Sequence, residues 1–350
     1  MTGAPVTLVA TTAVFTACLV LALVLVLTKV GRERRRRRRA ALVAPLRRHL
    51  IAVSAGEDDG PARSALVAAE GPSRRAVTGA VADLLGKVRG LPAEHLVEVL
   101  DRHGALESAM ADLRRSSPVR RAQAAQLLGV SRVPDAVDAL VEALQDKAGE
   151  VRSSAAYALG LIGDPRAAAP LLAAVGAPGA GLPAGLAAGA LLGMGVGISG
   201  ALGDALSDPD PRTRTVAAHV CGTGSFIRSL PCLRERLALD PDLTVRETCA
   251  QALGSIGRAD DVEVLARHTE ASQPLPLRRV CAEALGQLGE DAAVSTLAAL
   301  LHDPDPRLAE IAATSLVRLG PCGRGALEAA GHERAVQSAL TIAALQGVLR

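Results

Sequence analysis

The sequence of 350 residues has almost no aromatic side chains: no tryptophan, one tyrosine and two phenylalanines. Proteins that bind single-stranded nucleic acid need aromatic platforms on which bases stack. Residues 1–39 carry a charge of +7, so the remainder carries −4 of the total of +3 (+3 − 7 = −4). Because the basic character is confined to one short run, the sequence predicts no nucleic-acid partner.

The sequence also lacks paired cysteines. None of its six cysteines forms a C-x-x-C pair, which argues against a zinc site and against a thioredoxin-like motif. Cys249 and Cys281 occupy the same position of a repeated pattern, where small residues are otherwise found. The spacing therefore predicts small, buried thiols in a reducing compartment.

The amino-terminal segment lacks charge over the 23 residues 6–28, roughly 34 Å of helix. A basic run follows at once, and positive charge stays on the cytoplasmic side of a membrane. The sequence thus predicts a single-pass inner-membrane protein with its amino terminus outside and its body in the cytoplasm. The run is also expected to hold anionic lipid headgroups; its basic residues are Lys29, Arg32, Arg34, Arg35, Arg36, Arg37, Arg38 and Arg39.

One fourteen-residue pattern recurs through the body of the chain. TVRETCAQALGSIG at 244–257 is followed 32 residues later by PLRRVCAEALGQLG at 276–289. An arginine marks each copy at multiples of 31 or 32 residues; these are Arg120, Arg152, Arg214, Arg246 and Arg278. A period of this length predicts stacked structural repeats.

Each copy predicts a pair of helices. In the first helix Val245, Cys249 and Leu253 fall on one face, and the glycine that follows suits a helix end or a closely packed last turn. The second helix is shorter, as at 291–303. Asp-Pro joints such as 207–212 suit helix starts, because aspartate accepts from free backbone N–H groups and proline there loses no bond. One such pair cannot bury its own stripe of alanine and leucine, so neighbouring pairs must stack.

These residues resemble the HEAT repeat family, and more narrowly the bilin-lyase-type HEAT-like repeats, over about 115–320. The resemblance implies an all-α solenoid of helical hairpins. The predicted organisation is a membrane anchor, a basic juxtamembrane linker, divergent helical pairs, HEAT-like repeats and closing helices, at 1–31, 32–61, 62–114, 115–324 and 325–350.

Residues 167–203 contain no charge, and glycine recurs there at every fourth position from Gly181 to Gly197. Such a face is typical of packed membrane helices, so 182–202 is either a second span or a divergent repeat. The repeat register passes straight through this segment, which favours the divergent repeat. Its glycines predict the least stable layer of the array.

Two enzymes share this repeat type. The resemblance to HEAT-repeat deoxyhypusine hydroxylase would require several His-Glu pairs that bind iron, but His332-Glu333 is the only such pair in the sequence and Glu94-His95 is reversed. A bilin lyase would require an aromatic lining for its tetrapyrrole. The sequence predicts no catalytic residue, no metal, no cofactor and no small-molecule substrate.

The sequence therefore favours a membrane-tethered cytoplasmic scaffold or adaptor. Its partner would be a protein held in a groove lined by the second helices. An alternative is a regulatory or scaffolding subunit of a membrane enzyme complex. The candidate partner-binding residues have mixed charge and are Asp138, Glu142, Glu263, Arg267 and Ser295.

Overall fold

The computed structural model describes residues 19, 21, 23, 29–30, 33–34, 37–38, 40–57, 60–179 and 181–330. Every regular element within these residues is a helix, which confirms the predicted all-α fold. The chain divides into two compact units, Met1–Ser108 (unit 1) and Ala109–Arg350 (unit 2). The domain boundaries predicted from the sequence stay predictions.

No helix among the described residues is long and apolar enough to cross a membrane. This finding contradicts the predicted location as a single-pass inner-membrane protein. Freedom from charge is only one requirement, since a span also needs a continuous helix of about 20 residues. The longest helix with described bounds, α4 (Gly71–Leu85), has 15 residues. Of residues 6–28, only Leu19, Leu21 and Leu23 are described.

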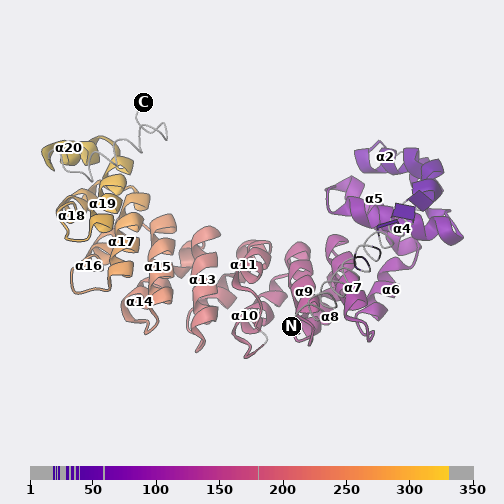
Figure 1. Cartoon of the computed structure of the whole chain (residues 1–350), viewed down its shortest axis with the longest axis horizontal. Helices are drawn as coiled ribbons and strands as arrows, with labels where there is room; N and C mark the ends of the chain where they lie inside the picture. The colour runs from indigo at the N-terminus through magenta and orange to yellow at the C-terminus, as the bar shows by residue number, and fades with distance from the viewer. Residues whose placement is uncertain are drawn as a thin grey trace, which may run out of the picture. The chain divides into compact units, whose positions relative to one another are not determined.

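Unit 2 is built from helix pairs that stand side by side (Figure 1). The first helices of the pairs pack directly on one another along the row, and each second helix packs mainly on first helices. The first helices are α7 (Pro118–Val130), α9 (Gly149–Ile162), α11 (Ala184–Leu192), α13 (Pro211–Thr223), α15 (Leu243–Ile256), α17 (Leu275–Leu288) and α19 (Pro306–Arg318). The second helices are α8 (Val137–Ala143), α10 (Ala168–Gly176), α12 (Ser199–Ala205), α14 (Leu230–Leu239), α16 (Asp261–Arg267) and α18 (Val294–Leu300).

Two further helices lie at the limits of this stack. α6 (Ala105–Asp112) runs across the division between the units, and α20 (Gly320–Ala330) packs on α18 and α19. The predicted closing helices at 325–350 lie outside the described residues after Ala330.

The glycine of the repeated pattern lies inside the first helix, where it lets the next first helix approach. A Cβ on Gly254 would lie 2.8 Å from the Cα of Ala284, and a Cβ on Gly222 would lie 2.8 Å from the Cα of Ala252. Such distances leave no room for even a methyl group. Of the two roles that the sequence allowed for this glycine, the closely packed last turn is therefore the observed one.

An arginine–aspartate pair ties each joint to the helix before it. Arg214 on α13 donates two hydrogen bonds, of 2.7 and 2.8 Å, to the carboxylate of Asp240 at the end of α14. Asp240 also accepts a 2.9 Å bond from the backbone N–H of Asp242, where α15 begins. Both charged side chains are buried, at 8% and 0% exposure. One ion pair thus connects three consecutive helices.

The same arrangement recurs with one shift and one exception. Its most amino-terminal copy uses Arg121 with Asp146 at 2.6 Å, and not the predicted Arg120, because the local period is 31 residues. A further copy joins Arg278 to Asp303. Arg246 instead donates to the side chain of Gln273 at 2.8 Å, so this joint has no carboxylate partner.

The charge-free segment forms an ordinary layer of the stack. α11 packs between α9 and α13, and a turn at Gly195–Ile198 leads into α12. The observed helix pair agrees with a divergent repeat. Gly185 and Gly189 face open space, with no atom within 4 Å of a Cβ placed on either. These two glycines therefore serve no packing purpose within the described chain.

Unit 1 contains α2 (Arg47–Ala55), α3 (Pro61–Val67), α4 and α5 (Leu91–Arg102), preceded by the turn η1 (Ala44–Leu46). His103 is buried at its centre. Its Nε2 donates to the carbonyl of Leu66 at 3.2 Å, and its Nδ1 lies 2.9 Å from the hydroxyl of Thr78. Burial lowers the pKa of His103 most, and the nearby Arg74 lowers it further against the opposing effect of the Leu66 carbonyl.

The close approach of first helices predicts opposite effects for two glycine substitutions. Gly254→Ala should destabilise the array by about 1–2 kcal/mol, because the new methyl group overlaps Ala284 and outweighs the gain in helix propensity. The matched control Gly189→Ala adds the same group in open space and should stabilise by about 0.5–1 kcal/mol. Thermal and denaturant unfolding midpoints measure both. Shifts of the same sign would contradict this packing.

The buried ion pair gives a second prediction. Asp240→Asn leaves the guanidinium of Arg214 buried without its counter-charge and should cost about 3–5 kcal/mol. Asp164→Asn is the control, because its partner Arg166 is 67% exposed and pairs of that kind contribute about 0–1 kcal/mol. Unfolding midpoints of the two variants should differ accordingly. Equal losses would show that burial of the pair has no energetic effect.

A third prediction concerns pH. Because the folded pKa of His103 is lowered, the unfolded state binds the proton more tightly, so stability is present above the ordinary pKa of 6.5 and is lost as pH falls below it. Hydrogen exchange of α4 amides, corrected for intrinsic rates, should become faster between pH 7.5 and pH 5.5. In His103→Gln this acceleration should disappear. An unchanged pH response in that variant would assign the effect to another group.

Candidate functional site

The exposed faces of three consecutive first helices carry polar side chains in register. One row contains His219 of α13, Gln251 of α15 and Glu283 of α17, each 32 residues after the last. A second row, one helical turn further on, contains Thr223, Ser255 and Gln287. The repeat places these side chains at equal heights because each helix begins at an equivalent joint.

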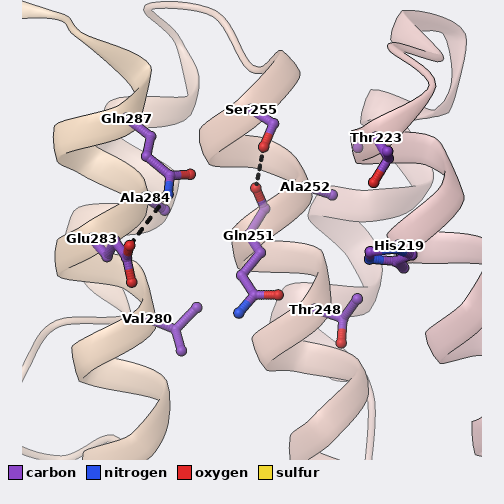
Figure 2. A pocket seen from close by; sticks show the side chains of 11 residues that line it. His219, Thr223, Thr248, Gln251, Ala252, Ser255, Val280, Glu283, Ala284 and Gln287 are labelled. Atoms are coloured by element: carbon purple, nitrogen blue, oxygen red, sulfur yellow. Dashed lines mark hydrogen bonds between the residues drawn. The ribbon is translucent and has the colours of Figure 1, made fainter. Parts of the chain in front are cut away.

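These rows border a hollow of about 250 Å³ on the surface of the first helices (Figure 2). Small residues occupy its floor, namely Gly222, Ala252 and Ala284. They are the residues through which the helices approach one another, so the packing that joins the layers also makes the hollow. Thr248 and Val280 complete the lining at its lower edge in the view of Figure 2.

Some polar groups of the hollow are already hydrogen-bonded and others are open. The hydroxyl of Ser255 donates to the backbone carbonyl of Gln251 at 3.1 Å, and the amide of Gln287 donates to the carboxylate of Glu283 at 3.4 Å. Within the described residues the side chains of His219 and Gln251 make no hydrogen bond to the protein. Both are exposed, so their donors and acceptors face the hollow and the solvent.

The charged groups near the hollow are largely paired. The guanidinium of Arg318 lies 3.8 Å from the carboxylate of Glu283. Arg279 donates bonds of 2.9 and 2.8 Å to Asp305, which raise the pKa of Arg279 and lower that of Asp305. Glu247, one turn before Gln251, lies outside the lining. Burial, followed by the charge of Asp242, raises the pKa of Glu247.

The cysteines of this region are buried behind the first-helix faces. Burial raises the pKa of Cys221 to about 11 and the pKa values of Cys249 and Cys281 to about 12. A thiol of this kind stays protonated and is a poor nucleophile at neutral pH. The prediction of small, buried thiols is confirmed for these three residues, whereas Cys322 is exposed.

A second hollow, of about 540 Å³, lies where α13 and α15 begin, beside the loop before α11. Its arginine, Arg212, bonds to the carboxylate of Asp210 and to the carbonyl of Gly176, each at 3.1 Å. Its carboxylate, Asp242, accepts from two backbone N–H groups of α15. The charged side chains of this hollow are therefore engaged in holding the joints.

The partner-binding residues predicted from the sequence lie on the second helices and are exposed. Asp138 and Glu142 lie on α8, whereas Glu263 and Arg267 lie on α16, 4.0 Å apart, and Ser295 lies on α18. α10, α12 and α14 come between α8 and α16 along the stack, so the structure does not bring the five residues together. Their role in binding stays a prediction.

The predicted lipid-binding residues are only partly described. Lys29, Arg34, Arg37 and Arg38 are exposed, and Arg37 forms a 3.0 Å ion pair with Glu33. No contact with lipid has support in the structure. The remaining members of the run lie outside the described residues; they are Arg32, Arg35, Arg36 and Arg39.

Within the described residues no three His, Cys, Asp or Glu side chains are grouped so that they could hold a metal ion. The His332-Glu333 pair lies outside those residues, and Glu94-His95 lies on α5 in unit 1. The sequence did not single out His219, Gln251 or Glu283. The signal that could have found them is the repeat itself, since all three occupy one position of the pattern.

Family models match most of unit 2. A model of HEAT repeats matches residues 105–191 and 200–280, and a model of PBS lyase HEAT-like repeats matches residues 277–303. No curated protein matches the sequence.

Solved structures with a similar fold include the karyopherin Kap121p. A mutant of Kap121p has a TM-score of 0.55, and Kap121p bound to the extreme C-terminus of the protein phosphatase Cdc14p has one of 0.54. Each is 13% identical over 82% of this chain, and this chain spans only 36% of the length of Kap121p. At this identity the likeness shows a shared fold alone.

Two enzymes of the same repeat class give lower TM-scores. The complex of CpcE and CpcF of phycocyanin lyase from Nostoc sp. PCC7120 is 23% identical, covers 67% of this chain and 94% of its own, and has a TM-score of 0.35. Human deoxyhypusine hydroxylase is 24% identical, covers 78% and 98%, and has a TM-score of 0.31. The row of helix pairs in unit 2 is therefore an array of HEAT repeats, joined toward its carboxyl end by a repeat of the PBS lyase HEAT-like kind.

Proposed function

We propose that this protein is a non-catalytic binding scaffold that holds a segment of a partner protein across α13, α15 and α17. The observation that carries the proposal is the hollow, into which three consecutive repeats direct side chains with open hydrogen-bonding groups. Polar side chains gathered from several repeats are an arrangement suited to an elongated ligand, because each repeat adds one contact point.

The class of the partner is supported by two considerations. The hollow combines amide, imidazole, hydroxyl and carboxylate groups, which match the mixed donors and acceptors of a polypeptide. Kap121p, which shares the fold, has been solved with the C-terminus of Cdc14p bound. A shared fold does not determine function, so that complex supports a protein partner here only by analogy.

The first helices are a better place for this surface than the second helices. Side chains of α13, α15 and α17 meet at one hollow because glycine and alanine hold these helices close. The exposed residues predicted on the second helices are divided between distant pairs. A partner segment would therefore make more contacts per residue on the first-helix faces.

Site-specific crosslinking in cells tests the proposal. A photo-reactive amino acid in place of Gln251 should capture a protein, and the same protein should be captured from the position of Gln287. The control position is Glu263, an exposed residue of α16 on the other layer. Mass spectrometry identifies the adducts.

The outcomes distinguish the two surfaces. Adducts from Gln251 and Gln287 that are absent from Glu263 support the proposed surface. Adducts from Glu263 alone would move the binding surface to the second helices, as the sequence had predicted. A chain that forms no protein adduct at any of the three positions would contradict the scaffold role.

A further inference from the structure

We infer that the hollow recognises the main chain of an extended, uncharged peptide segment, and not the charged side chains of its partner. This inference rests on the proposed function and names the chemistry of the partner at the same site. It follows from the hydrogen-bonding groups of the hollow, from the pairing of its charges and from the shape of its floor.

The groups that line the hollow suit peptide bonds. A peptide bond offers one donor and one acceptor side by side, and the amide of Gln251 at the centre offers the same combination. Neutral His219 on one side also has one donor and one acceptor. Since the hydroxyl of Ser255 gives its proton to a backbone carbonyl, its oxygen remains an acceptor for a peptide N–H.

The charges of the hollow are balanced within the protein. Glu283 provides the only carboxylate of the lining, and it already meets the amide of Gln287 at 3.4 Å and the guanidinium of Arg318 at 3.8 Å. Arg279 on the same helix is bound through two hydrogen bonds to Asp305. A basic or acidic partner side chain would have to displace one of these pairs, whereas an uncharged segment would not.

The floor allows a backbone to lie close to the helices. Gly222, Ala252 and Ala284 are small, so the floor has no side chain that would hold a peptide away. Closely packed helices are about 8 Å apart, and an extended chain rises about 3.3 Å per residue. A segment of roughly five residues therefore crosses the three helices, and the open volume of about 250 Å³ offers no deep pocket for a large side chain.

The test uses peptides as probes and the full chain as target. A phage-displayed library of random octapeptides is selected on the protein, and the selected peptides are synthesised with a fluorescent label. Affinity is measured by fluorescence anisotropy for the unchanged chain, for Gln251→Ala and for the matched control Gln145→Ala, an exposed glutamine outside the hollow.

Main-chain recognition makes three expectations. Gln251→Ala should weaken binding about five- to tenfold, and Gln145→Ala should not change it. Methylation of a central backbone nitrogen of the peptide should weaken binding about tenfold, because it removes the N–H donor. An increase in salt from 50 to 500 mM should change the affinity less than twofold, because no new ion pair forms.

Failure of the inference and failure of the proposed function look different. Peptides that need Gln251 but tolerate backbone methylation, or that carry basic residues and lose affinity steeply with salt, would overturn main-chain recognition and leave the binding surface in place. Selected peptides that bind Gln251→Ala and the unchanged chain equally well would overturn both. Both variants are surface substitutions, and their unfolding midpoints should match that of the unchanged chain.

Discussion

The structure of unit 2 depends on how closely its first helices approach one another. A glycine on one helix and an alanine on the next leave no space for a side chain between them, as at Gly254 and Ala284. This contact sets the distance between layers, and every other feature of the stack must accommodate it. The hollow is one result, because helices that lie this close bring the side chains of three repeats within reach of a single ligand.

The joints add charge to this apolar packing. Burial of an ion pair removes both charges from water, which is unfavourable unless hydrogen bonds satisfy them fully. The pair of Arg214 and Asp240 meets that condition through two bonds between the side chains and one from the backbone. Such pairs contribute geometry more than net stability, since they hold each joint in one arrangement. Arg246 lacks a carboxylate partner, so its joint is held mainly by packing.

Much of the fold could be predicted from the sequence because its period is strict. The stripe of Val245, Cys249 and Leu253 is buried as expected, and Asp242 caps α15. A local period of 31 moved the amino-terminal arginine of the pattern from position 120 to Arg121. The binding surface was harder to predict, because periodicity shows which residues share a face but not which layer brings its faces together. The anchor was inferred from composition, and composition does not show whether a helix is continuous.

The thiols of Cys221, Cys249 and Cys281 lie in three consecutive first helices, buried at 0% exposure. Because their pKa values are raised and solvent does not reach them, a thiol-reactive reagent can modify each one only after the layer around it opens. The chain thus carries a built-in chemical clock in each of three adjacent repeats. The order in which the three sulfurs react reports where the array begins to come apart.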